Sequence, residues 1–160
     1  SYAGPAGSIG RAFKYEGNPF LGPRLLSEAV DRGWLPADLV GWEVVAPVPL
    51  HPRRERQRGY NQSHLLARVL ARKGRVPLLR KALRRVRYTD KQTGLSAAGR
   101  RQNVRGAFAP GRHSVEGMHV LLVDDVFTTG ATAGECARVL RRAGAGAVSV
   151  FTLVRTQPGH

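Results

Sequence analysis

The sequence predicts an α/β fold built on a doubly wound, mostly parallel sheet. Short apolar runs alternate with segments of helical apolar spacing, which is the pattern of strands joined by covering helices. The runs at 43–48, 120–123 and 148–154 are rich in valine, as is typical of parallel strands buried on both faces. With 160 residues and an apolar fraction of 42%, the chain is expected to form one folded domain over residues 1–160.

Helical spacing of apolar residues predicts three helices in the first half of the chain. They cover residues 8–16, 23–32 and 61–73. Asn61 has the side chain of a helix N-cap. Gly74 is predicted to close the third helix, because glycine adopts the left-handed conformation that ends many helices.

Two stretches carry no sustained apolar period and are predicted to lack helices and strands. Residues 50–60 are polar and basic, so a loop is expected there. Residues 84–105 are a longer polar stretch, and a loop of that length in a small domain is usually a functional lid or is disordered. Short strands are predicted at 76–79 and from residue 107.

The most informative stretch is 119–132, which joins a strand, two carboxylates, a hydroxyl-rich loop and a helix. The apolar run 120–123 leads into Asp124 and Asp125, and helical spacing resumes at about Thr132. Adjacent buried carboxylates repel, so the pair needs a cation or hydroxyl partners. The loop offers hydroxyl and backbone N–H groups to a phosphate at the carboxyl edge of the sheet. The alternative is an ordinary strand–loop–helix joint whose acids cap the helix.

Charge is distributed unevenly along the chain. Residues 51–112 contain 18 Lys or Arg and 2 acids, Glu55 and Asp90, whereas the remainder is close to neutral. We call this segment the basic belt. It predicts an anionic partner, which is a phosphorylated small molecule, a nucleic acid, or both. A GC-rich genome explains arginine in place of lysine, but it does not explain why acids avoid the belt.

The composition also predicts a cellular location for the chain. No apolar run approaches the ~20 residues of a membrane helix, and the first residues lack the basic and apolar segments of a signal peptide. The single cysteine, Cys136, excludes an internal disulfide. It lies one helical turn after the loop, so buried packing is expected rather than nucleophilic chemistry. A cytoplasmic location without membrane insertion is the prediction.

Residues 120–132, Val-Leu-Leu-Val-Asp-Asp-Val-Phe-Thr-Thr-Gly-Ala-Thr, resemble the phosphoribosyl pyrophosphate (PRPP) signature of type I phosphoribosyltransferases. Three further stretches narrow the resemblance. They are Phe-Lys-Tyr-Glu-Gly at 13–17, the segment 47–62 from Pro-Val-Pro-Leu to Gly-Tyr-Asn-Gln, and the segment from Gln92 to Phe108. Together they are similar to the ComF family of competence-associated, phosphoribosyltransferase-like proteins. Members of that family commonly begin with a Cys-rich zinc module, which a chain with one cysteine lacks.

The resemblance implies how PRPP is held. Asp124 and Asp125 are the implied catalytic pair, holding the ribose hydroxyls and helping to hold Mg²⁺, which binds mainly through PRPP itself. The implied 5′-phosphate site consists of Thr128, Thr129, Gly130, Ala131 and Thr132. The implied pyrophosphate site consists of Leu50, His51, Arg53 and Arg58.

The resemblance also implies a lid and a hood. Residues 84–105 are the implied lid, which closes over the substrate and excludes water. Its cations that reach toward the leaving group are Arg87, Lys91 and Arg101. Residues 1–22 and 151–160 are the implied hood, a small cover formed by the two chain ends.

Several of these residues have simpler interpretations. The arginines of 50–60 bind pyrophosphate or a nucleic-acid backbone in one interpretation and are solvated loop charges in the other. Arg53 and Arg58 are preferred as ligands because they match the family pattern. His51 is interpreted first as a loop residue, and Asn61 first as a helix cap.

Two functional hypotheses follow. In the first, the chain transfers ribose 5-phosphate from PRPP to a nitrogen acceptor that the sequence does not identify. In the second, it is a non-catalytic factor of DNA uptake that senses PRPP and binds single-stranded DNA through the basic belt, with Tyr60 and Tyr88 stacking on bases. The sequence is silent on oligomeric state, and a homodimer is one assembly that is compatible with it.

Overall fold

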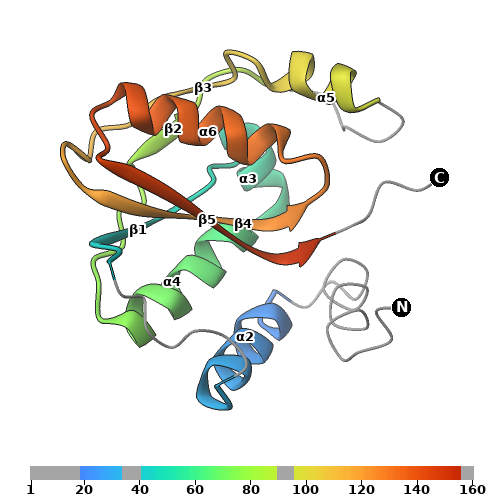
Figure 1. The fold of residues 1–160 in the computed structure, drawn as a ribbon. Helices are drawn as coiled ribbons and strands as arrows, with labels where there is room; N and C mark the ends of the chain where they lie inside the picture. Colours follow the sequence, from blue (N-terminus) through green and yellow to red (C-terminus); the bar gives the residue numbers. More distant parts are fainter. Residues whose placement is uncertain (1–18, 34–40, 90–95, 156–160) are drawn as a thin grey trace.

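The computed structural model describes residues 19–33, 41–89 and 96–155 of the chain. At its centre is a three-stranded parallel sheet in the order β1-β4-β5 (Figure 1). The strands are β1 (Val44–Pro47), β4 (His119–Phe127) and β5 (Ala147–Arg155). The middle strand is the apolar run of the sequence motif, so this motif lies in the centre of the sheet.

Helices cover both faces of this sheet, which confirms the predicted doubly wound arrangement. Figure 1 shows one pair of helices below the sheet and a third helix above it. The pair is α2 (Leu21–Asp31) and α4 (Gln62–Gly74), and the third is α6 (Ala131–Arg142). The predicted helices over 23–32 and 61–73 and the predicted helix start near Thr132 are therefore confirmed.

Alternate residues of β4 point into two separate cores. Leu121 and Val123 pack against α2 and α4, whereas Val120 and Leu122 pack in the cluster that contains α6. All four are at most 1% exposed, as the continuous apolar run predicted. Cys136 of α6 is fully buried in the second core, and burial raises the pKa of its thiol well above the usual value. The cysteine is thus a packing residue, as predicted.

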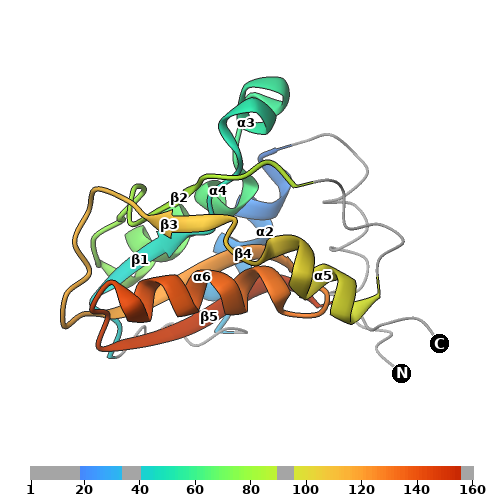
Figure 2. The same cartoon turned by 90° about the horizontal axis from the view of Figure 1, so that it is seen from above.

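A second layer lies beside α6. Strands β2 (Leu83–Arg85) and β3 (Phe108–Pro110) form an antiparallel pair, and α5 (Ala97–Val104) lies between them in sequence. Both views place α5 beside the N-terminal end of α6 (Figures 1 and 2). Helix α3 (Pro52–Arg58) follows β1 and stands out from the body of the molecule in Figure 2.

The prediction of a loop over 50–60 is wrong, because α3 occupies most of it. The Nδ1 atom of His51 accepts a hydrogen bond from the backbone N–H of Arg53 at 3.3 Å, which caps the helix. Pro52 occupies the first turn, where its missing N–H is not needed, and Gly59 ends the helix with a φ of 80°. The helix buries no residue. An apolar period could not reveal it for that reason.

The stretch 84–105 also contains regular structure that had not been predicted. Its first residues belong to β2, and α5 occupies its C-terminal part. The side chain of Ser96 caps α5 by accepting the N–H of Gly99 at 3.1 Å. Of the apolar side chains described in α5, Val104 alone is buried. No periodic pattern of apolar residues therefore marks this helix in the sequence.

Two strand predictions and one cap need smaller corrections. The predicted strand 76–79 is a single parallel bridge between Leu78 and Val45. The strand predicted over 120–123 extends through both aspartates to Phe127. At the end of α4, Arg75 rather than Gly74 takes the left-handed conformation, with a φ of 54°.

Some predictions concern residues outside the described ranges. These include the helix over 8–16, Lys91 and most of the implied hood. The described ranges contain no helix that is long and apolar enough to cross a membrane.

Candidate functional site

The two aspartates lie on the part of β4 that extends beyond its pairing with β1. β1 pairs with β4 up to the Pro47–Val123 pair, while β5 stays paired with β4 as far as Phe127. Asp124 and Asp125 follow Val123 directly. They therefore lie at the carboxyl edge of the sheet, in the position where ligands of parallel α/β sheets bind.

Asp124 is buried beside a second acid. The residue is 8% exposed, and its Oδ1 accepts hydrogen bonds from the Ser63 hydroxyl at 3.3 Å and from the backbone N–H of Asp125 at 2.9 Å. Burial, followed by the charge of Asp125, raises the pKa of Asp124 to about 8. Burial and the neighbouring carboxylate thus favour the protonated form of Asp124.

The loop after β4 has the shape of an anion site. Gly130 has a φ of 72° and precedes α6, which starts at Ala131 with no acidic residue in its first turn. A Cβ at position 130 would lie 2.6 Å from the ring of Phe127, so glycine is needed for both conformation and space. The N-terminus of α6 supplies backbone N–H groups and a positive dipole end.

Thr129 adds a second observation at this loop. Its Oγ1 atom is buried and has no hydrogen-bond partner among the described residues. A buried hydroxyl without a hydrogen-bond partner lowers the free energy of unfolding by roughly 1–3 kcal/mol, so such groups are usually bonded to a ligand or to water. The sequence predicted a ligand-binding role for Thr129 from its hydroxyl group and its place in the motif. The buried Oγ1 atom is a structural observation in favour of that role.

A cavity of about 900 Å³ opens beside the loop, between α5 and α6. Thr129, Gly130 and Ala131 line it together with Arg101 of α5. The structure therefore brings Arg101 to the same cavity as the loop 128–132. Arg87 instead donates to the backbone carbonyls of Asn103 (2.8 Å) and Arg105 (2.9 Å), so in this conformation it fastens the end of α5.

The residues after β1 are not gathered at one point. His51 caps α3 and contacts the ring of Tyr88 edge to face, with 5.3 Å between ring centroids. The guanidinium of Arg53 lies 5.7 Å from the same ring. Arg58 is at the other end of α3, where it lies over Tyr60 at 5.6 Å. Of the two preferred arginines, only Arg53 thus belongs to the cluster around His51.

Arg85 is a candidate site residue that the sequence pattern does not single out. Its guanidinium lies 5.2 Å from the Phe108 ring and donates to the Thr89 hydroxyl, while its Nε is buried and has no partner in the described chain. Burial lowers the pKa of Arg85, followed by the charge of Arg54, and the nearby Asp124 partly offsets these effects. Nothing in the run of arginines at 84–87 distinguished it, because its burial depends on Phe108, which is distant in sequence.

Comparison with known proteins gives consistent matches. Residues 60–159 match the family described as the phosphoribosyl transferase domain. Competence protein F of Haemophilus influenzae is 43% identical over 115 residues, which are 71% of this chain and 50% of that protein. DNA utilization protein YhgH of Escherichia coli K12 is 44% identical over 112 residues, which are 70% of this chain and 49% of that protein. The chain spans about half the length of these curated relatives.

A solved structure matches as well. Glutamine PRPP amidotransferase from B. subtilis, complexed with ADP and GMP, is 27% identical to the chain with a TM-score of 0.55. The match covers 82% of this chain and 26% of that one.

The buried carboxyl of Asp124 generates a prediction for the ligand-free protein. Its pKa is about 8 in the folded state and close to the ordinary 3.8 in the unfolded state. Between these values the folded chain holds a proton that the unfolded chain has released, so the free energy of unfolding falls as pH rises. Asp124→Asn removes this loss and is expected to be more stable by roughly 2–5 kcal/mol at about pH 8.

Urea unfolding between about pH 5 and about pH 8.5 measures this effect. Glu28→Gln, which removes an exposed acid of α2, is the control and should keep the wild-type pH dependence. Identical pH slopes in the wild type and in Asp124→Asn would contradict the assignment.

Proposed function

The chain belongs to the phosphoribosyl transferase domain family, and we propose that it binds PRPP and transfers its ribose 5-phosphate to a nitrogen nucleophile, releasing pyrophosphate. Its relatives confirm the ComF resemblance and the type I phosphoribosyltransferase fold. Their names, competence protein and DNA utilization protein, favour a role linked to DNA uptake. The observation that carries the proposal is the buried Thr129 hydroxyl, which has no partner among the described residues and lies in a loop between the acids Asp124 and Asp125 and the start of α6.

In this proposal the loop holds the 5′-phosphate. The residues involved are Thr128, Thr129, Gly130, Ala131 and Thr132. The hydroxyl of Thr129 donates to a phosphate oxygen, which gives it the partner that the ligand-free structure lacks. Backbone N–H groups at the start of α6 add further donors, and the absence of an acid in the first turn of α6 avoids repulsion.

Asp124 and Asp125 hold the ribose hydroxyls in this proposal. When pyrophosphate departs, positive charge develops on the sugar ring, and a nearby carboxylate stabilises it. Asp124 serves in this role once it has lost its proton. The hydroxyl and cationic partners that arrive with the substrate favour the charged form of Asp124, because they replace the solvation lost on burial.

The leaving pyrophosphate lies against the residues that follow β1. We assign this role to Leu50, His51, Arg53 and Arg58, with Arg53 best placed and Arg58 farthest along α3. Arg85 joins them because its buried Nε has no partner in the part of the chain that the structure describes. Charge-assisted hydrogen bonds from arginine to phosphate oxygens stabilise the anionic leaving group.

The lid and hood complete the proposed site. Arg101 already lies at the cavity beside the phosphate loop. Arg87 reaches the leaving group only after it releases the end of α5, and Lys91 is assigned by resemblance alone. Residues 84–105 then exclude water, which limits hydrolysis of PRPP. Residues 1–22 and 151–160 are assigned to the hood.

The residues present suit Mg²⁺ that arrives with its substrate. The described residues contain no group of three or more His, Cys, Asp or Glu that could hold a metal. Asp124 and Asp125 supply carboxylate oxygens, which suits an ion usually held by one or two carboxylates plus substrate phosphates. When bound, the ion neutralises the charge that accumulates on the leaving pyrophosphate.

Removing both acids tests the function. Asp124→Asn combined with Asp125→Asn is expected to abolish saturable binding of PRPP with Mg²⁺ in calorimetry, because both ribose contacts lose their charge. Release of pyrophosphate across a panel of purine and pyrimidine bases then identifies the acceptor in the wild type. Glu28→Gln combined with Asp31→Asn removes two exposed acids of α2 and should bind PRPP normally. Equal PRPP affinity of the Asp124/Asp125 variant and the wild type would refute the site.

Thr129→Val separates binding from folding. The substitution keeps the shape of the side chain and removes a buried hydroxyl that has no partner within residues 19–33, 41–89 and 96–155. Thermal stability is therefore expected to stay equal or rise. PRPP affinity is expected to fall about tenfold to hundredfold, because one hydrogen bond to a charged phosphate is lost. Unchanged affinity would show that the Thr129 hydroxyl faces something other than the phosphate.

One observation favours a second function, binding of single-stranded DNA. Tyr88 is 42% exposed and lies against His51 and Arg53, so an aromatic face and a cation sit together on the basic belt. Stacking on such a face and attraction to a phosphate backbone are how single strands are bound without sequence preference. In this alternative the PRPP site acts as a sensor.

Tyr88→Ala is expected to weaken binding of a single-stranded oligonucleotide by about tenfold, since one stacking contact is worth roughly 1–3 kcal/mol. Fluorescence anisotropy at two salt concentrations measures it. Phe20→Ala removes a 64% exposed aromatic outside the belt and should have no effect. A binding constant that does not fall with salt would exclude a phosphate-backbone interface.

A further inference from the structure

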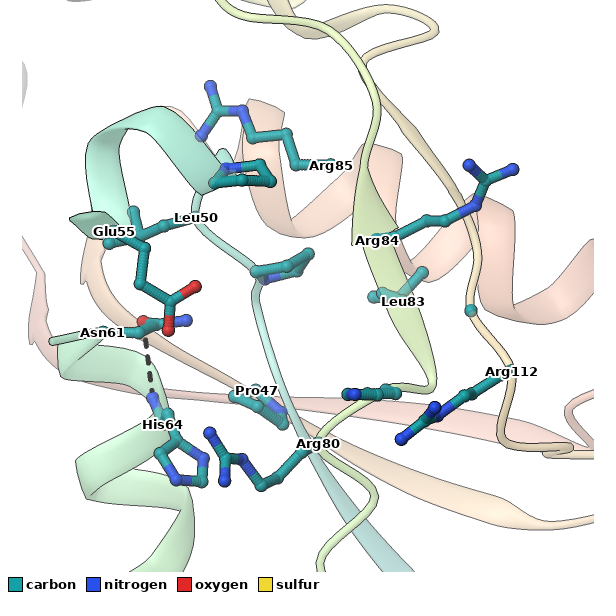
Figure 3. Close-up of a pocket in the computed structure, with 14 residues that line it drawn as sticks. Pro47, Leu50, Glu55, Asn61, His64, Arg80, Leu83, Arg84, Arg85 and Arg112 are labelled. Atoms are coloured by element: carbon teal, nitrogen blue, oxygen red, sulfur yellow. Dashed lines mark hydrogen bonds between the residues drawn. The ribbon is translucent and has the colours of Figure 1, made fainter.

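A second cavity, of about 370 Å³, lies on the side of β1 that faces away from β4 (Figure 3). One wall comes from α3 and α4, and the other from the segment that leads into β2. No residue of the loop 128–132 and neither aspartate lines it. Leu50 and Arg85, which we assign above to the pyrophosphate, do line it. The cavity therefore adjoins the proposed pyrophosphate site and is distinct from the loop 128–132.

The cavity combines an apolar floor with a cationic rim. Pro47, Pro49 and Leu83 are among the residues of the floor. The positively charged lining residues are Arg80, Lys81, Arg84, Arg85 and Arg112. Glu55 is the one acid among the lining residues, and none of these five cations takes part in an ion pair within the described chain. Such a lining suits a ligand that is apolar at one end and strongly anionic at the other.

Two planar side chains stand together on the wall. Figure 3 shows the ring of His64 beside the guanidinium of Arg80. The Nδ1 of His64 is buried and has no partner among the described residues. Burial lowers the pKa of His64, followed by the charges of Arg80 and Arg68, so the ring is neutral at pH 7. A neutral imidazole either donates to or accepts from a heterocycle, and an arginine plane stacks on one.

We propose that this cavity binds one nucleotide, with its phosphate among the arginines of the rim and its base against the proline and leucine floor. The volume falls within the range of small-molecule sites, and cations outnumber acids five to one in the lining. The nucleotide comes either as a free nucleoside monophosphate or as the 5′-terminal nucleotide of a DNA strand. Both sources present the same phosphate and base.

Calorimetry of the wild-type chain with dAMP, deoxyadenosine and inorganic phosphate tests the proposal. The expected result is saturable binding of one dAMP per chain, with weaker binding of the two fragments. Arg80→Ala combined with Arg112→Ala removes two rim charges and should lower dAMP affinity about tenfold to hundredfold. Oligonucleotides with and without a 5′-phosphate distinguish the sources: tighter binding than dAMP identifies a strand end, and weaker binding identifies a free nucleotide.

Matched variants keep the test decisive. Arg24→Ala combined with Arg72→Ala removes two exposed arginines that line no cavity described here, and it should bind dAMP like the wild type. Glu55→Gln should raise dAMP affinity, so the proposal stays testable even if the rim variant fails to fold. Absence of saturable binding by dAMP and by both oligonucleotides, or equal losses in the two arginine variants, would overturn it.

Titration with PRPP and Mg²⁺ separates this inference from the proposed function. The Arg80/Arg112 variant should bind PRPP like the wild type, because neither arginine lines the cavity at the loop 128–132 or belongs to the residues assigned to PRPP. A parallel loss of PRPP and dAMP binding in that variant would merge the two sites and refute a second one. Failure of PRPP binding in the wild type would refute the proposed function and leave the dAMP result to be judged by itself.

Discussion

The site depends on the unequal lengths of two neighbouring strands. β1 stops pairing with β4 at Pro47, and the chain enters α3 at Pro52, while β4 continues beside β5 to Phe127. The carboxylates of Asp124 and Asp125 are thereby held on a rigid strand at the edge of the sheet. The same strand end places the loop before α6 a few residues later, so the position of the acids relative to the loop is fixed by backbone geometry. A site assembled only from flexible segments would lack this precision.

Local patterns in the sequence were sufficient for the elements that bury an apolar face. β4, α4 and α6 carry apolar residues at the spacing that their two cores require, so periodicity identified them. Helices α3 and α5 were missed because they bury almost nothing and are stabilised by caps and backbone hydrogen bonds. Pro52 in the first turn and Gly59 after the last are helix signals that the sequence does contain, whereas histidine is not a usual N-cap residue, so the cap at His51 is seen only in the structure.

The candidate site residues fall into two groups, those that a contiguous motif identifies and those whose contacts depend on tertiary packing. Asp124, Asp125 and the loop 128–132 are contiguous, so a motif could identify them and the structure could place them together. Arg85, Arg87 and Arg101 belong to a basic run in which residue type carries no information about partners. Arg87 holds the end of α5 because it donates to two backbone carbonyls there. Arg85 is half-buried because its guanidinium packs on Phe108 of β3. Such roles follow from tertiary packing, which a sequence pattern does not contain.

The ligand-free site is electrostatically incomplete in two complementary ways. Asp124 is buried without a cation strong enough to keep it charged, and the pKa near 8 expresses that cost. Arg85 is half-buried, and its buried Nε has no partner among the described residues. A neutral ligand would correct neither defect. A ligand with hydroxyl groups for the acids and a polyanionic group for the arginines would correct both at once, and PRPP with Mg²⁺ has that distribution of charge. The preference for such a ligand would then arise because the fold has already removed Asp124 and Arg85 from water. Each of the two side chains regains a polar partner only when the whole substrate is bound.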